Sequence, residues 1–138
     1  MARTNLRTSL EMPYDEALAK IPQLLKDIGF GVLTRIDVDE TLRARLGVPF
    51  RRYTILGACN PLLAHRALSA DPDVGILLPC NVALYEDDAG QTVVAIMDPL
   101  ESLAEDEEAA LREVAAEART KLQHLLYCLT TLPNRRAA

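Results

Sequence analysis

Hydrophobic and polar residues alternate with two different periods along this chain, and each period predicts one kind of secondary structure. A period of two predicts β-strands over five segments: 3–10, 31–36, 52–59, 81–86 and 91–97. A period of three to four predicts α-helices over four segments: 13–28, 38–46, 61–70 and 106–130. The polar character of 3–10 indicates a sheet edge, whereas 31–36 is expected to be a buried strand.

Prolines mark several of the predicted boundaries. Three pairs place a helix-capping residue directly before a proline: Asn60-Pro61, Asp71-Pro72 and Asp98-Pro99. The residue before proline is held extended, as a cap must be, and the fixed φ of proline suits the first helical position. Each pair is therefore expected to begin a helical turn. Pro22 lies inside the first predicted helix, which is expected to kink or divide near Ile21.

The last predicted helix is the longest and has one clear apolar face. Its apolar residues recur at steps of three and four: Leu111, Ala115, Ala118, Leu122, Leu125 and Leu129. The spacing is that of a coiled-coil seam, but the seam is short and includes two alanines. We therefore expect the helix to pack against the domain's own sheet, with a dimer contact at its exposed flank as the alternative.

Composition indicates one ordinary globular domain. The chain has 138 residues, of which 49% are hydrophobic and 25% charged. We expect residues 1–138 to form a single compact two-layer α/β domain of the α+β type, with a mixed sheet of about five strands covered by helices. The chain contains neither the apolar segment of a signal peptide nor the ~20 apolar residues of a membrane span. A cytoplasmic protein without membrane contact is expected.

The charge distribution disfavours nucleic acid as a partner. The net charge is −5, and residues 101–117 hold seven acids against one base, Arg112. Aromatic residues make up only 4% of the chain, so platforms for stacking bases are scarce. A short acid-free stretch contains Arg43, Arg45, Arg51 and Arg52. We interpret these arginines as solvated surface, with an anion-contacting patch as the alternative.

Two Cys-Asn pairs form the candidate site. Cys59-Asn60 ends a predicted strand directly before a helix, and Cys80-Asn81 precedes the next strand. If the two strands are antiparallel neighbours, both cysteines lie near one rim. A helix N-terminus favours anions, including thiolates, and thiolates are natural ligands for Cu(I) or Zn. The rim is therefore expected to bind a small ligand or a soft metal ion, with Cys59 and Cys80 as metal ligands; buried packing and capping roles are the alternative.

Other residues are weaker candidates. His65 lies in the helix after Cys59, and Glu86 and Asp98, which end neighbouring predicted strands, could act as a carboxylate pair. His124 and Cys128 are four residues apart on the last helix and would supply half of a metal site. No complete catalytic or cofactor signature is present. Whether the protein is an enzyme therefore stays open, and no cofactor is indicated.

Several sequence blocks carry a resemblance to a known family: Gly29-Phe30-Gly31-Val32-Leu33-Thr34, Gly57-Ala58-Cys59-Asn60-Pro61, Leu77-Leu78-Pro79-Cys80-Asn81-Val82 and Met97-Asp98-Pro99. Through them the chain resembles the domain of unknown function 302 family over about residues 10–130, within the subgroup that has both Cys-Asn blocks. The resemblance implies a compact two-layer α/β domain, commonly a homodimer, and no established reaction.

Two functions of different kinds therefore remain open. The first is a binding module with a small-ligand or soft-metal site at the rim of Cys59, Asn60, Cys80 and Asn81. The second is a structural or protein-interaction homodimer whose cysteines belong to the core. A thiol-dependent enzyme is less favoured, because the sequence shows no base positioned to activate a cysteine.

Overall fold

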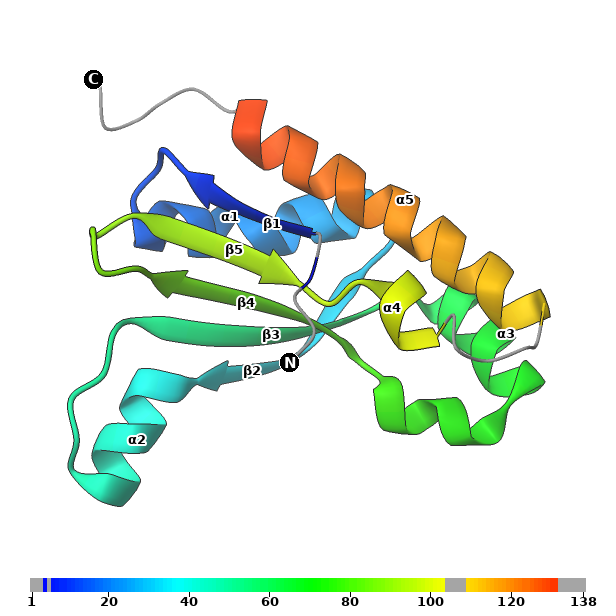
Figure 1. The fold of residues 1–138 in the computed structure, drawn as a ribbon, viewed down its shortest axis with the longest axis horizontal. Helices are drawn as coiled ribbons and strands as arrows, with labels where there is room; N and C mark the ends of the chain where they lie inside the picture. Colours follow the sequence, from blue (N-terminus) through cyan, green and yellow to red (C-terminus); the bar gives the residue numbers. More distant parts are fainter. Residues whose placement is uncertain (1–3, 5, 104–108, 132–138) are drawn as a thin grey trace.

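The fold was obtained as a computed structural model, which describes residues 4, 6–103 and 109–131. Five strands are present: β1 (Leu6–Leu10), β2 (Gly31–Asp37), β3 (Tyr53–Cys59), β4 (Cys80–Glu86) and β5 (Thr92–Ile96). The helices are α1 (Tyr14–Asp27), α2 (Val38–Leu46), α3 (Pro61–Ala70), α4 (Pro99–Leu103) and α5 (Ala109–Thr131), with a 3-10 helix η1 (Pro72–Leu77) (Figure 1). The predicted starts at Arg3 and Asp106 lie outside the described residues.

The five strands form one sheet in the order β1-β5-β4-β3-β2. The sequence pattern predicts a mixed sheet, but every pairing is antiparallel. A parallel pair needs a connection that crosses a sheet face. Here α2 and α3 lie at opposite ends of the sheet, so each returns the chain at the end where it left (Figure 1). The edge position predicted for the first strand is confirmed.

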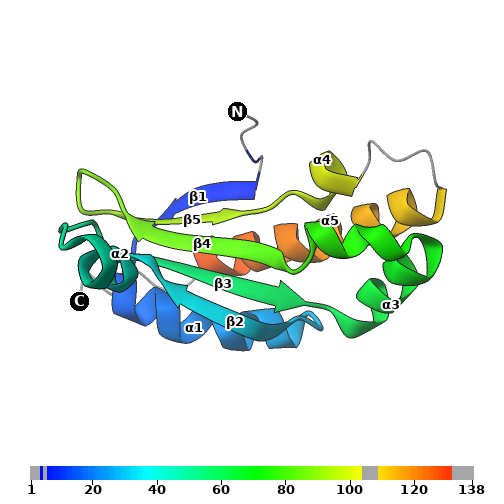
Figure 2. The same ribbon diagram turned by 90° about the horizontal axis from the view of Figure 1, so that it is seen from below.

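Helices α1 and α5 cover one face of the sheet, which makes the two-layer α+β architecture (Figure 2). Every second residue along the strands points toward this layer and packs against apolar side chains of the helices. The largest fully buried side chains include Leu6, Leu56, Leu84 and Ile96 from the strands, and Ile21, Leu25, Leu122 and Leu125 from the helices. The core is aliphatic, as the composition predicts.

The predicted apolar face of the last helix is confirmed. All six of its residues are buried, and the face packs within this protomer: Leu111, Ala115, Ala118, Leu122, Leu125 and Leu129. The first predicted helix runs unbroken from Tyr14 to Asp27 through Pro22, so it does not divide near Ile21. Its buried residues on both sides of the proline hold the two halves on the same core. No described helix is long and apolar enough to cross a membrane.

The three predicted capping pairs are confirmed as helix starts. The side-chain oxygen of Asn60 accepts a hydrogen bond from the Leu63 N–H at 3.1 Å, which caps α3. Asp71 caps η1 in the same manner, and the Oδ1 atom of Asp98 accepts from the Leu100 N–H at 3.0 Å at the start of α4. These local bonds determine where the chain turns at the ends of β3 and β5.

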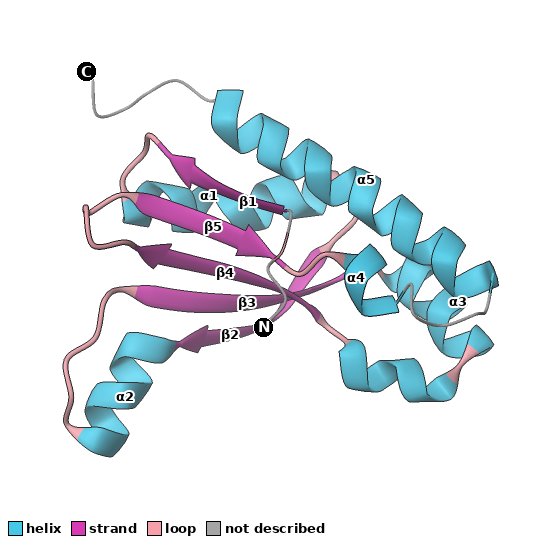
Figure 3. Cartoon of the chain, viewed as in Figure 1, coloured by secondary structure: helices cyan, strands magenta, loops and turns pink. Residues whose placement is uncertain are grey.

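One strand differs from its prediction. The pattern predicts that 31–36 is buried, but every residue from Gly31 to Ile36 is exposed in β2. The strand lies at the sheet edge, and the helical layer covers it only in part (Figure 3). Its apolar residues therefore have one neighbouring strand and little packing above or below.

Candidate functional site

The ends of β3 and β4 bring the two Cys-Asn pairs together. The strands are antiparallel neighbours, and Ala58 lies directly opposite Cys80. Residues that oppose each other share a sheet face, so both side chains point toward the helical layer. Cys59 follows Ala58 along the strand, and side chains alternate between faces. The two cysteines are therefore close in the backbone, but their side chains leave on opposite faces of the sheet.

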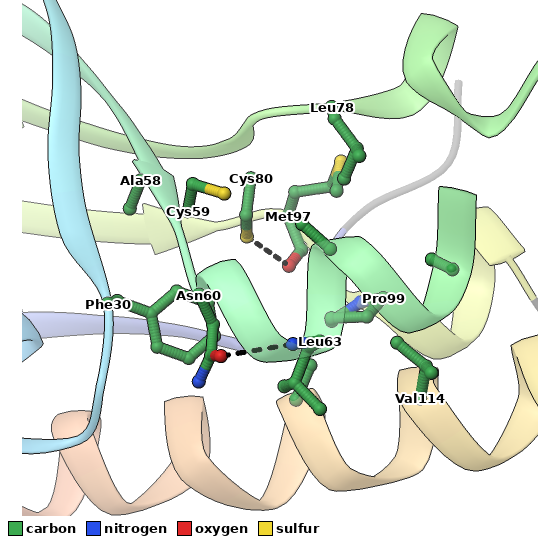
Figure 4. A pocket seen from close by; sticks show the side chains of 13 residues that line it. Phe30, Ala58, Cys59, Asn60, Leu63, Leu78, Cys80, Met97, Pro99 and Val114 are labelled. Carbon is green, nitrogen blue, oxygen red and sulfur yellow. Dashed lines mark hydrogen bonds between the residues drawn. The ribbon is translucent and has the colours of Figure 1, made fainter. Parts of the chain in front are cut away.

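A cavity of about 50 Å³ lies at this end of the sheet. The ends of β3 and β4, the loop after β5, and helices α3 and α5 enclose it (Figure 4). Most of its walls are apolar, formed by Phe30, Ala58, Leu63, Ala64, Ala67, Leu78, Met97, Pro99, Val114 and Ala118. Cys59, Asn60 and Cys80 complete the lining. A single water needs about 10–15 Å³ of such space, so the cavity has room for a few heavy atoms.

Cys80 lies on the buried side of the cavity and is protonated at neutral pH. It is 6% exposed, and its thiol donates to the Met97 carbonyl oxygen at 3.6 Å. Burial, followed by the negative charge of Asp98, raises the pKa of the Cys80 thiol to about 12. Cys80 therefore acts here as a small apolar residue with a weak donor. Cys59, by contrast, is half-buried.

Asn60 forms one side of the cavity, and Gly29 lies against its side-chain amide. Gly29 has φ +89°, and a Cβ at this position would lie 3.0 Å from the Nδ2 atom of Asn60. The glycine thus permits both the positive φ and the close approach of the amide. Directly after it, Phe30 enters the cavity wall and is 4% exposed. The capping role of Asn60 is therefore also a wall-forming role.

The other predicted site residues lie outside the cavity. Asn81 is exposed on β4, and His65 is exposed on α3, beside a shallow groove that it shares with Arg66 and Glu113. Glu86 lies opposite Thr92, at the far end of the β4–β5 hairpin. Of the predicted site residues, Cys59, Asn60 and Cys80 line the cavity, and these three do not.

The predicted carboxylate pair does not form. Glu86 ends β4 and Asp98 follows β5, and because these neighbours are antiparallel, the two carboxylates lie at opposite ends of the sheet. Asp98 instead lies near the cavity end, where its side chain is 2% exposed and its Oδ2 atom accepts from Arg119 Nε at 3.1 Å. It holds α4 and α5 together and does not line the cavity.

The surroundings of the remaining metal and anion candidates do not support either site. His124 Nε2 and Cys128 Sγ lie 3.5 Å apart on α5, but within the described residues no group of three metal-ligating side chains is present. The predicted arginine stretch is divided, because Arg51 pairs with Asp88 at 2.7 Å and Arg52 pairs with Asp15.

Several lining residues carry no signal in the sequence. Phe30, Leu63 and Val114 come from segments far apart in the chain, and each has the pattern of an ordinary core residue. Only the packing of α3 and α5 at the sheet end makes them neighbours. Their role as cavity walls could not be inferred from spacing.

The fold and cavity define a small α+β domain with an antiparallel sheet, one helical layer and an apolar cavity at one end. The chain belongs to the family described as "Domain of unknown function DUF302", whose sequence model matches residues 6–127. This finding confirms the resemblance to the family.

A solved structure has the same fold. The crystal structure of uncharacterized conserved protein DUF302 from Bacillus stearothermophilus is similar with a TM-score of 0.82 and 30% sequence identity. The similarity covers 89% of this chain and 95% of that one. No curated protein matches the chain.

Proposed function

We propose that this protein is a binding module whose cavity takes a small apolar molecule, or the apolar end of a larger one. The observation that carries the proposal is the apolar-walled cavity of about 50 Å³ between the sheet end and helices α3 and α5. Binding sites in proteins are typically concave and mostly apolar, with a few polar groups at the margin. Asn60 supplies such a group here.

The same geometry supports an uncharged ligand over a soft metal ion. Soft metals are held by thiolates, usually several around one point. The side chains of Cys59 and Cys80 leave on opposite faces of the sheet, and the pKa of Cys80 is raised to about 12. To bind a metal ion together with Cys59, Cys80 would have to turn its side chain to the other face of the sheet and lose its thiol proton.

Binding is also better supported than thiol catalysis. A catalytic cysteine needs a base within hydrogen-bond reach. Among the residues that the structure describes, the cavity lining includes no histidine, aspartate or glutamate, and His65 lies on the exposed side of α3. The cavity therefore offers an apolar surface to a ligand without a group that would take the thiol proton.

Xenon is the first probe of the cavity, because it binds in dry apolar cavities. We would record methyl NMR spectra under xenon pressure and follow Leu63 and Val114, whose side chains line the cavity. Ala64→Leu should fill the cavity. Ser69→Leu is the matched control, since Ser69 lies on the same helix, is exposed and does not line the cavity.

The expected result is a shift of the lining methyls in the wild type and in Ser69→Leu, and its loss in Ala64→Leu. Straight-chain alcohols of increasing length then measure how much apolar chain the cavity accepts. Each added CH₂ should tighten binding about fourfold until the cavity is full. The proposal fails if xenon leaves the lining methyls unchanged, if Ala64→Leu responds like the wild type, or if alcohol affinity is independent of chain length.

A further inference from the structure

A hydrogen bond lies in the cavity wall, between the Cys80 thiol and the Met97 carbonyl oxygen. The sulfur and oxygen atoms are 3.6 Å apart, and both residues line the cavity. Figure 4 shows the bond beside the start of α3, among the side chains that enclose the space. A polar contact is therefore present within a wall that is formed mostly by apolar side chains.

The Met97 oxygen is a good acceptor that is held by a weak donor. Met97 follows the last residue of β5, and its N–H donates to the Asn81 carbonyl oxygen at 2.9 Å. A regular antiparallel pair exchanges two such backbone bonds. Among the described residues, however, the donor to the Met97 oxygen is the Cys80 thiol and not the Asn81 N–H. A thiol is a weak donor and a carbonyl oxygen has two lone pairs, so this oxygen can accept a stronger hydrogen bond.

The electrostatics of this wall also favour a donor. The negative charge of Asp98 reaches the Cys80 thiol, since burial and then this charge are the two causes that raise the pKa of the thiol. The Met97 oxygen adds the negative end of its carbonyl dipole. Both groups attract the hydrogen of a hydroxyl and repel an oxygen that carries no hydrogen. A ligand that can donate is therefore favoured over one that can only accept.

The size and the lining of the cavity limit this donor to a small uncharged molecule. Among the described residues, no charged side chain lines the cavity. An ion would therefore lose its hydration without gaining a partner, which costs far more than the burial of a hydroxyl that forms a hydrogen bond. A volume of about 50 Å³ has room for a few heavy atoms. These limits describe a short aliphatic alcohol.

We propose that the cavity selects short aliphatic alcohols over ketones of the same size, with the ligand hydroxyl donating to the Met97 carbonyl oxygen. The hydrocarbon part of the ligand packs against Leu63 and Val114. The inference rests on the proposed binding function and assigns the selectivity of that site to one backbone oxygen. The apolar walls set the length of the ligand, and the Met97 oxygen sets the kind of polar group that it carries.

The matched probes are 2-propanol and acetone, which have the same number of heavy atoms and differ in a hydroxyl against a carbonyl. Each is titrated into the wild type, and the methyl NMR signals of Leu63 and Val114 report binding. Xenon is measured on the same sample as a probe without a polar group. The dissociation constant of 2-propanol should be lower than that of acetone by about fivefold, which corresponds to one additional hydrogen bond.

The variant Cys80→Ala tests whether the Met97 oxygen is the acceptor. It removes the thiol that shares this oxygen, so the preference for 2-propanol over acetone should increase at least about twofold. Val114→Ala is the matched control, because Val114 is 4% exposed and lines the same cavity. It enlarges the space without removing the Cys80–Met97 bond, so its preference should equal that of the wild type. Circular dichroism establishes that both variants are folded, and the Leu63 methyls report binding in both.

The outcomes separate this inference from the proposed function. Equal affinity of the wild type for 2-propanol and acetone would overturn the inference, even where xenon binds, and this comparison needs no variant. A preference in Cys80→Ala that is no larger than in Val114→Ala would overturn it as well. If xenon and both solutes leave the lining methyls unchanged, the proposed function fails and the inference fails with it.

Discussion

Helices α2 and α3 are both short connections between strands, but only α3 has buried residues. Each joins two antiparallel neighbouring strands, and they have nine and ten residues respectively. Helix α3 buries Leu63 and Ala67 against α5 and the sheet end, whereas α2 buries nothing. The difference arises because α5 extends over one end of the sheet and not over the other. A connecting helix becomes part of the core only where a second layer meets it.

Ion pairs show the same contrast. Arg119–Asp98 at the cavity end and Arg35–Asp37 in β2 have the same N···O distance of 3.1 Å. The Asp98 side chain is 2% exposed, and the Asp37 side chain is 31% exposed. The two ion pairs therefore have the same N···O distance but differ in solvent exposure, and the exposure decides how much each pair contributes to stability.

The largest expected effect concerns thiol reactivity at the packed end. At pH 8, a thiol with a pKa of about 12 has roughly a thousandfold less thiolate than an ordinary cysteine. In native protein, Cys80 should therefore label with a chromogenic disulfide at least about a thousandfold more slowly than a cysteine peptide. Cys59→Ser/Cys128→Ser isolates its signal. Rapid labelling of Cys80 without denaturant would show that the cavity end opens readily.

The same pKa shift has a consequence for alkaline stability. The unfolded thiol ionises near pH 9, but the folded thiol stays protonated until about pH 12. The stability that protonated Cys80 contributes is thus fully present below about pH 9 and is lost as the pH rises toward 12. Urea unfolding of Cys80→Ala should show a weaker decline between pH 8 and 10 than the wild type. Parallel declines would contradict the assignment of this loss to Cys80.

The next effect compares one leucine from each region. Leu63→Ala should lower the free energy of unfolding by about 3 kcal/mol, because Leu63 is 4% exposed and its loss enlarges a cavity. Leu33→Ala in β2 should lower the free energy of unfolding by less than about 0.5 kcal/mol, since Leu33 is 67% exposed. Urea denaturation at one low protein concentration measures both. Similar costs at the two positions would mean that β2 is packed in solution.

The smallest effect compares the two ion pairs. Arg119→Ala leaves the buried Asp98 carboxylate without its cation and should cost about 2 kcal/mol. Arg35→Ala removes a partner from a solvated pair and should cost at most about 1 kcal/mol. Thermal unfolding at low and high salt distinguishes them, because only the exposed pair is strongly screened. A larger loss for Arg35→Ala would contradict the burial contrast.

The local features of the fold could be predicted from the sequence. The bounds of α3, the caps at Asn60 and Asp98, and the buried face of α5 all follow from residues a few positions apart. Backbone preferences and helical periodicity act over that range, so they can be recognised in a single chain. The proximity of the two Cys-Asn pairs also follows once the strands are known to be antiparallel neighbours.

Which surfaces are covered depends on how the elements pack, and no local pattern predicted it. An apolar pattern shows that a segment can be buried, but burial requires another layer, and the helical layer covers β2 only in part and buries no residue of α2. The register of β3 on β4 places the two thiols on opposite faces of the sheet. The packing of α5 brings Phe30, Leu63 and Val114 together around one cavity. These outcomes depend on contacts between segments distant in the chain, whose energies no local pattern records.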